Sequence, residues 1–291
     1  MKELVIRTIS GIAFIVIMVT AILCGPLSYT LLFSAIIAVM INEYINITCG
    51  KNLTVHKLLA ITSGILLFTI SVLVVSGKAD GIYLTISAIP IFAFFIINLY
   101  RKEFNIHKYR ENGERENNGY ELFPFAVTSV VYIALPFSIC NMALFSHSAD
   151  GNIIYSPQTL LLMFILLWAN DVGAYCVGSS LGQKYGGKLF PSISPKKSWM
   201  GFFGGLASCL IIAFISGFIP FFEISWTKSV VLATIICIFG VWGDLAESQL
   251  KRNYGVKDSG KIMPGHGGML DRFDAALVAF PVAALALQLL A

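Results

Sequence analysis

The sequence predicts an all-α, polytopic integral membrane protein, and three observations carry this prediction. Hydrophobic residues make up 57% of the 291-residue chain and charged residues only 12%. The mean hydropathy is +0.79, which is more apolar surface than one soluble core of this size could bury. The apolar runs are long and do not alternate with polar residues, which favours transmembrane helices over the strands of a barrel.

We predict about nine transmembrane helices, because each apolar run approaches the roughly 20 residues that a helix needs to cross a bilayer. They cover residues 8–25, 27–46, 57–76, 82–100, 123–146, 157–179, 201–221, 229–250 and 273–290. The first run follows two basic residues like a signal peptide, but Leu23 beside Cys24 is a poor cleavage site, so we expect a retained helix. The segment 101–121 mixes charges of both signs and is expected to be a solvated loop.

The basic residues predict how the helices are oriented. If the N-terminus is cytoplasmic, 18 of the 20 lysines and arginines fall in segments on the inner side of the membrane. Only Lys78 and Lys228 fall outside, which is the asymmetry that the positive-inside rule describes. We therefore predict a cytoplasmic N-terminus and an odd number of helices.

Four acidic residues lie within or beside the predicted helices: Glu43, Asp171, Asp244 and Glu247. Placing a charged side chain at membrane depth costs roughly 2.5–3.5 kcal/mol of insertion free energy, so such residues usually have a function. Glu43 lies near the inner end of its helix, where we expect it to reach the interface. Asp171 lies in the middle of its run, where it could serve a site or form a hydrogen bond between helices.

One helical face and two loops combine acids, bases and glycines. Asp244, Glu247, Ser248 and Lys251 are spaced i, i+3, i+4 and i+7, which predicts one stripe on a helix. Carboxylates and hydroxyls are ligands for Mg²⁺, while the glycines of the PGHGG stretch let backbone N–H groups approach an anion. The loop 184–199 repeats the combination of glycines, hydroxyls and bases. Together these features predict a site for phosphate groups on the inner face.

Three motifs give the sequence a family resemblance. The stretch SQLKRNYGVKDSGKIMPGHGGMLDRFDA (248–275) resembles the signature of phosphatidate cytidylyltransferases, and NDVGAYCVG (170–178) and SPKKSWMGFFGG (194–205) are similar to two further blocks of that family. These blocks lie within residues 165–275. Two positions depart from the family pattern: Met200 stands where glutamate is common, and Ala275 where serine is frequent.

The resemblance implies that CTP and phosphatidic acid react to give CDP-diacylglycerol and pyrophosphate. It implies Mg²⁺, alone or with a second cation, held by Asp244 and Asp271 as the metal centre. It also implies a multi-pass protein of the inner (plasma) membrane with its active site facing the cytoplasm. We expect residues 1–122 to form N-terminal helices with a polar cytoplasmic loop. Residues 123–291 should form the catalytic region, with polar loops at about 180–200 and 251–272.

We assign roles to the candidate residues on this basis. Asp244, Asp271, Lys251 and Arg272 are predicted to be catalytic. The predicted substrate-binding residues are Asn170, Asp171, Ser194, Lys196, Lys197, Ser198, Ser248, Arg252, Lys257, Asp258, Gly265, His266, Gly267, Gly268 and Asp274. His266 could donate to a phosphate or hold its loop together. The expected partners are CTP, phosphatidic acid and membrane lipids, with no nucleic acid; a homodimer is left open.

Two other classes of protein explain the acidic residues of the predicted helices less well. An ion-coupled transporter would use Asp171, Asp244 and Glu247 as an ion path, but no inverted repeat is evident and the polar residues gather on one face. Another Mg²⁺-dependent lipid-phosphate transferase, of the CDP-alcohol phosphotransferase kind, would carry a DGxxAR motif that the sequence lacks.

Overall fold

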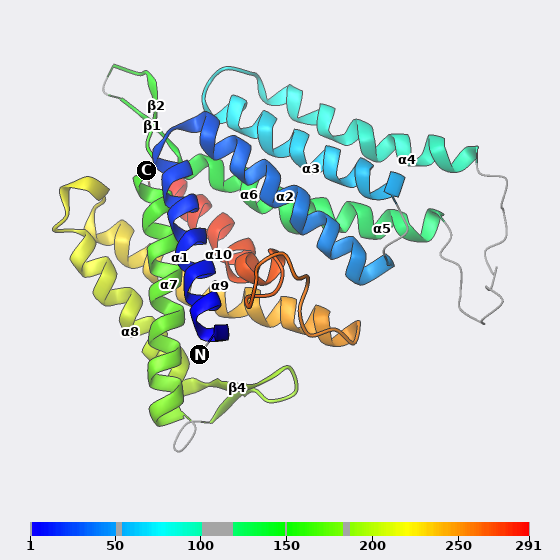
Figure 1. Cartoon of the computed structure of the whole chain (residues 1–291). Coiled ribbons are helices and arrows are strands. Elements are labelled where there is room, and N and C mark those ends of the chain that lie inside the picture. The colour runs from blue at the N-terminus through cyan, green and yellow to red at the C-terminus, as the bar shows by residue number, and fades with distance from the viewer. Residues whose placement is uncertain (1, 51–53, 101–118, 149, 183–186, 291) are drawn as a thin grey trace.

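The protein is almost entirely helical (Figure 1), as the sequence predicts. The computed structural model describes residues 2–50, 54–100, 119–148, 150–182 and 187–290. Its long α-helices are α1 (Lys2–Leu23), α2 (Pro26–Cys49), α3 (Thr54–Val75), α7 (Gln158–Val177), α8 (Trp199–Ser216), α9 (Trp226–Asn253) and α10 (Leu270–Leu289). Shorter helices are η1 (Gly81–Ala88), α4 (Ile89–Leu99), α5 (Gly119–Ser129), η2 (Val130–Ala134), α6 (Leu135–Cys140), η3 (Asn141–Ala143), η4 (Gly178–Gly182) and η5 (Pro220–Phe222). The described residues also form two antiparallel hairpins, β1 (Phe145–His147) with β2 (Ile153–Tyr155), and β3 (Lys188–Phe190) with β4 (Ser194–Ser198).

Seven described helical segments are long and apolar enough to cross a membrane. They are Val5–Leu23, Pro26–Cys49, Val55–Val75, Leu122–Ala143, Gln158–Gly182, Trp199–Ser216 and Trp226–Asn253. Of the other two predicted spans, 82–100 overlaps the shorter apolar segment Gly81–Ile97, and 273–290 lies in α10. The chain is thus a multi-pass membrane protein. The number of spans and the direction of the N-terminus stay predictions, and the polar segment at 101–118 lies outside the described residues.

The predicted span 123–146 is not one uninterrupted α-helix. It is divided into α5, a π-helical turn, α6 and a 3₁₀ turn. Pro136, at the start of α6, has no N–H to donate to the preceding turn, and a locally widened helix accommodates this loss. The segment still forms one apolar rod that packs beside α3 and α10.

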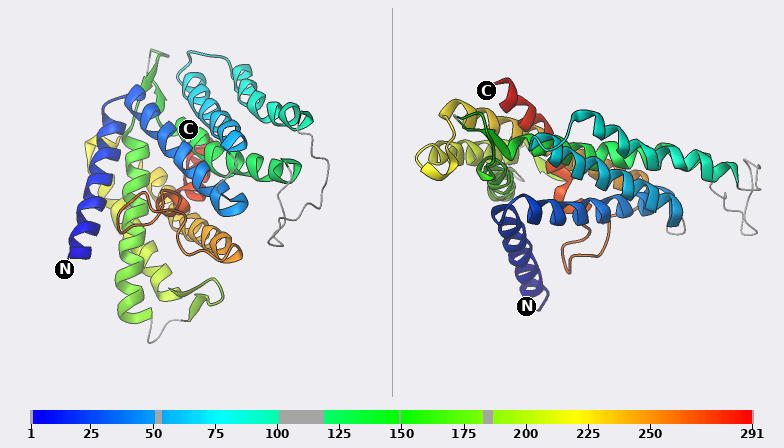
Figure 2. Two further views of the ribbon diagram at one scale, coloured as in Figure 1. Left: turned by 45° about the vertical axis from the view of Figure 1, so that its right-hand side comes forward. Right: turned by 90° about the horizontal axis from the view of Figure 1, so that it is seen from above.

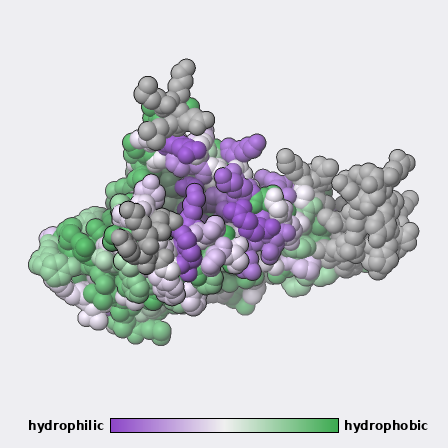
Figure 3. Space-filling view, turned by 90° about the horizontal axis from the view of Figure 1, so that it is seen from below, coloured by the Kyte–Doolittle hydropathy of each residue, from purple (hydrophilic) through white to green (hydrophobic). Residues whose placement is uncertain are grey.

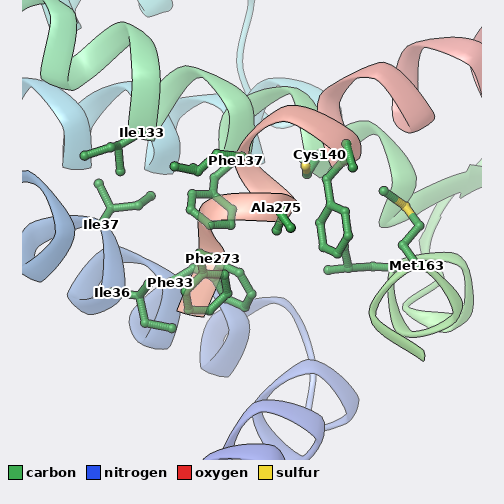
Figure 4. Close-up of a cluster of buried hydrophobic side chains, with 14 of the residues drawn as sticks. Phe33, Ile36, Ile37, Ile133, Phe137, Cys140, Met163, Phe273 and Ala275 are labelled. Carbon is green, nitrogen blue, oxygen red and sulfur yellow. The ribbon is translucent and has the colours of Figure 1, made fainter. Parts of the chain in front are cut away.

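A cluster of aromatic rings fixes the start of α10 in the centre of the molecule (Figure 4). Phe273 lies 5.4 Å from Phe137 of α6 and 6.3 Å from both Phe33 of α2 and Phe164 of α7, measured between ring centroids. All four rings are buried. Because apolar helices gain little from hydrophobic burial within lipid, close packing of this kind holds them together. The cluster therefore positions the acidic first turn of α10.

Helices α7 and α8 approach each other closely enough for their backbones to touch. A Cβ atom on Gly173 would lie 2.7 Å from the carbonyl oxygen of Gly204, so only glycine fits at this position. By contrast, α1 stands apart from the other helices (Figure 2), and only 11% of its apolar window is buried. The Tyr155 hydroxyl of β2 donates to the carbonyl of Ile22 near the end of α1, and Ser10 near its start contacts the loop between α9 and α10, as described below.

Candidate active site

A cavity of about 440 Å³ lies between α7, the β3–β4 hairpin and the facing ends of α8, α9 and α10. Four carboxylates line it, those of Asp171, Asp244, Asp271 and Asp274. Its other polar residues are Asn170, Lys196, Lys197, Ser198 and Arg272. Hydrophilic side chains gather in the middle of one face of the molecule, beside largely apolar surface (Figure 3). Residues from both predicted loops and from α7 and α9 thus meet in one place.

Asp244 is paired with a base from the hairpin. The Nζ atom of Lys197 lies 2.6 Å from Oδ2 of Asp244. On the same helix, the hydroxyl of Ser248 donates to Oδ1 of Asp244 over 3.1 Å. The i, i+4 contact is what the sequence spacing predicts for one helical face. Lys197 therefore joins the β3–β4 hairpin to α9 across the cavity.

Asp271 is held by one lysine and two backbone amides. Lys251 donates to Oδ1 over 2.7 Å, and the N–H groups of Ser259 and Gly268 donate to Oδ2 over 2.9 and 2.8 Å. Lys251 also lies 2.8 Å from Glu247, whose side chain is fully buried. This network connects α9, the loop between α9 and α10, and the first turn of α10. It holds the Asp271 carboxylate in one orientation.

Glu43 belongs to the same network, although no sequence motif connects it with the other candidate residues. Its side chain does not extend to an exposed position as expected, because Glu43 is only 6% exposed. It accepts hydrogen bonds from the backbone N–H groups of Met269 and Leu270, over 3.1 and 2.8 Å. These N–H groups belong to the start of α10, where a carboxylate also complements the helix dipole.

Glu43 is also linked to Asp271 through one serine. The Ser259 hydroxyl donates to Oε2 of Glu43 over 3.2 Å, and it accepts from the backbone N–H of Asp271 over 3.3 Å. A Cβ atom on Gly268 would lie 2.7 Å from Oε2 of Glu43 and 2.6 Å from the backbone nitrogen of Gly260. Glycine at 268 therefore makes room for the Glu43 carboxylate.

Replacing Glu43 with glutamine is expected to destabilise the protein by about 2 kcal/mol, because one amide N–H₂ would face a buried backbone donor. The measurement is the melting temperature of the detergent-solubilised protein. The matched control is Glu223→Gln, which changes an exposed acid on a turn. If both variants melted at the wild-type temperature, the capping role of Glu43 would be contradicted.

A second cavity, of about 700 Å³, borders the first. It is lined by the predicted residues Lys257, Asp258, Gly265, His266 and Gly267, together with Arg7, Gly260, Lys261, Met263, Pro264 and Arg272. Arg272 lines both cavities. Gly265 and Gly267 have φ angles of 76° and 84°, in the left-handed region that glycine adopts without strain. These turns shape one wall of the second cavity.

His266 contacts the first helix. Its Nδ1 atom lies 2.9 Å from the hydroxyl of Ser10, which also donates to the carbonyl of Pro264 over 3.1 Å. Burial lowers the pKa of His266, and the positive charges of Arg272 and Arg7 lower it further. The imidazole is therefore neutral at pH 7. Of the two roles that the sequence left open, this geometry favours holding the loop.

The remaining candidate residues differ in whether they line a cavity, support a residue that does, or lie apart from both cavities. Lys251 and Gly268 contact Asp271, and Ser248 contacts Asp244, without lining either cavity. Ser198, only 3% exposed, accepts from the N–H of Gly201 and caps α8. Ser194 and Arg252 are not among the described lining residues; Arg252 donates to the carbonyl of Val256 over 3.4 Å. Their predicted contacts with substrate stay predictions.

The two departures from the family pattern differ in position. Met200 is in the first turn of α8 and does not line the first cavity as far as the described residues show, whereas its neighbour Gly201 does. Ala275 lines that cavity and is buried against α9, where a Cβ atom on Gly243 would lie 2.9 Å from its Cα. Having methionine in place of glutamate at position 200 therefore does not change the number of carboxylates that line the first cavity.

The fold and the site together define a multi-pass membrane protein that gathers acids and bases around one polar cavity, an arrangement suited to phosphate groups. Comparison with known proteins agrees with this class. The chain belongs to the cytidylyltransferase family, whose model matches residues 5–290.

Several curated relatives are named phosphatidate cytidylyltransferase. The chain is 39% identical to one from Staphylococcus haemolyticus over 158 residues, which is 54% of this chain and 56% of the relative. It is 43% identical to one from Bacillus subtilis over 127 residues, which is 44% of this chain and 46% of the relative. The chain thus matches about half the length of these relatives.

Members of the cytidylyltransferase family generally depend on a divalent cation. In the described part of the chain, no three His, Cys, Asp or Glu side chains are placed to hold a metal ion by themselves. Asp244 and Asp271 nevertheless line one cavity, and Mg²⁺ commonly takes one or two carboxylates and completes its shell with water and phosphate. The donor set therefore suits a cation that is shared with a phosphorylated ligand.

Proposed function

We propose that the protein is a CTP:phosphatidate cytidylyltransferase, which makes CDP-diacylglycerol and pyrophosphate from CTP and phosphatidic acid. The observation that carries this proposal is the first cavity, where four carboxylates and three bases from separate motifs meet at the ends of membrane helices. The names of the relatives and the family match support it. Neither gives support to an ion-coupled transporter or to a lipid-phosphate transferase of another family.

The proposed reaction needs no strong general base. A phosphate oxygen of phosphatidic acid, already anionic at neutral pH, attacks the α-phosphorus of CTP, and pyrophosphate leaves. Catalysis then consists of bringing two polyanions together and stabilising the charge that develops on the transferred group. Lys196, Lys197 and Arg272 line the cavity and can hold phosphate oxygens in place.

Asp244 and Asp271 are the residues that would hold Mg²⁺. The cation, when bound, would neutralise phosphate charge and align the two substrates. In the structure, Lys197 forms an ion pair with Asp244, and Lys251 forms one with Asp271. Lys197 lines the cavity, so its ammonium group can turn from Asp244 to an incoming phosphate.

The surroundings of the cavity suit a substrate that stays in the membrane. Leu189, Phe202 and Val241 give the cavity an apolar part beside its charged part. Val172 and Tyr175, on the same helix as Asp171, are 63% and 75% exposed. Such apolar surface can contact acyl chains while the headgroup reaches the acids and bases. We infer a site at the cytoplasmic face of the inner (plasma) membrane, where CTP is present.

The test is pyrophosphate release by the purified protein in detergent. Wild type should release pyrophosphate only when CTP, phosphatidic acid and Mg²⁺ are all present, and a chelator should stop it reversibly. Asp244→Asn is expected to lower the rate at least about a hundredfold, because it removes a charge beside the reacting phosphates. Asp80→Asn, which changes an exposed acid far along the chain, is the matched control. A wild type that stayed inactive with every lipid phosphate and nucleotide would contradict the proposal.

A further inference from the structure

The second cavity concentrates positive charge, with four bases and one acid among its described lining residues. Its bases come from three parts of the chain: Arg7 from α1, Lys257 and Lys261 from the loop between α9 and α10, and Arg272 from α10. Within the described residues, none of the four forms an ion pair with a carboxylate. Among the described lining residues, Asp258 is the one acid. Like charges brought together in this way favour an anionic ligand.

The position of Arg7 is fixed by the loop and does not depend on α1 alone. Ser10, one helical turn further on, contacts both Pro264 and His266. A Cβ atom on Gly265 would lie 2.6 Å from Cγ of Arg7, so the arginine side chain passes directly over this glycine. Helix α1 and this loop lie beside each other in two views (Figures 1 and 2). The loop therefore holds an arginine that is more than 240 residues away in sequence.

The lining of the second cavity distinguishes it from the first. Its apolar side chains are those of Met263 and Pro264, whereas the first cavity has a larger apolar part. Arg7, Lys257 and Lys261 are exposed. Arginine and lysine side chains with free N–H donors bind phosphate oxygens well. A water-soluble polyphosphate matches this lining better than a lipid phosphate with its acyl chains.

We propose that the second cavity binds the β- and γ-phosphates of the nucleotide and the pyrophosphate that they become, with Arg7 of α1 as one of its bases. This inference rests on the proposed function. A bond forms between a phosphate oxygen of phosphatidic acid and the α-phosphorus of CTP. The bond between that phosphorus and the oxygen that links it to the β-phosphorus breaks. Pyrophosphate leaves with the electron pair of the broken bond.

The arrangement of the two cavities agrees with this reaction. In phosphoryl transfer the attacking and leaving oxygens lie roughly in line, on opposite sides of the phosphorus. A leaving group therefore needs a separate place next to the site of attack. Arg272 lines both cavities and can contact phosphates on either side of the bond that breaks.

The inference is tested by titrating inorganic pyrophosphate into the full-length protein in detergent with Mg²⁺ present, using calorimetry. Arg7→Ala is expected to weaken binding by roughly five- to tenfold, since it removes one exposed charge-assisted contact. Arg7→Lys should stay within about twofold of wild type because it keeps the charge. Lys78→Ala, an exposed base outside both cavities, should bind pyrophosphate like wild type. Lys261→Ala provides a second variant if Arg7→Ala does not fold.

Kinetics separate this inference from its alternatives. Arg7→Ala should raise the KM for CTP and the inhibition constant of pyrophosphate, and leave the KM for phosphatidic acid unchanged. A change confined to the KM for phosphatidic acid would overturn the inference in favour of a lipid-phosphate site. Unchanged pyrophosphate binding in both Arg7→Ala and Lys261→Ala would overturn it as well. An inactive wild type would instead count against the proposed function. In that case calorimetry would still show whether the second cavity binds pyrophosphate.

Discussion

Replacing Asp271 with asparagine is expected to lower the rate of pyrophosphate release from CTP and phosphatidic acid by at least about a hundredfold. The carboxylate accepts from Lys251 on one oxygen and from two backbone N–H groups on the other. The asparagine amide has one acceptor oxygen, so its N–H₂ group must face either the lysine or the backbone donors. The variant loses both a charge in the cavity and the geometry that holds the loop.

This loss can be distinguished from unfolding. The melting temperature should fall by only a few degrees, because the aromatic packing around Phe273 remains. Binding of Mg²⁺ together with CTP can be followed by the same melting assay, and the stabilisation expected for wild type should be absent in the variant. The control is again Asp80→Asn. An Asp271→Asn variant with near-normal turnover would show that Asp271 only supports the loop.

Replacing Lys251 with methionine is expected to have the largest effect on stability, about 3 kcal/mol. Lys251 lies between two acids, and its side chain is only 12% exposed, while that of Glu247 is fully buried. Removing the lysine leaves the Glu247 carboxylate buried with no cation beside it, and breaking such a pair from one side costs roughly 3–5 kcal/mol. Denaturation of the protein in mixed micelles measures the free energy of unfolding.

A second substitution identifies the cause. In the double variant Lys251→Met with Glu247→Gln, the buried charge is gone, and at least half of the lost stability should return. Turnover should not return, because Asp271 still lacks its lysine. If the double variant were as unstable as Lys251→Met alone, lost packing and not an uncompensated charge would explain the effect.

Local spacing explains what the sequence could predict about this site. The i, i+4 relation between Asp244 and Ser248, and between Glu247 and Lys251, follows from helical periodicity and is seen in α9. The helical membrane fold likewise follows from composition and run length. Both depend only on neighbouring residues, and no knowledge of the tertiary arrangement is needed.

The contacts that the sequence did not predict all depend on distant parts of the chain. Glu43 binds residues more than 200 positions away, and Ser10 binds His266 at a separation of 256. The pairing of Lys197 with Asp244 likewise needs a hairpin and a helix to meet. The glycines of the PGHGG stretch illustrate the same difficulty. Their sequence suggests an approach to a substrate anion, but in the structure the Gly268 N–H binds the protein's own Asp271.

The carboxylate of Glu43 also has a consequence for how the protein is made. Synthesis proceeds from the N-terminus, so α2 is completed long before Ser259, Met269 and Leu270 leave the ribosome. Until then Glu43 lacks these partners, and holding it at membrane depth costs roughly 2.5–3.5 kcal/mol. The early helices are therefore expected to stay loosely placed until α10 arrives, so that the candidate site and the first half of the bundle become ordered in the same late event.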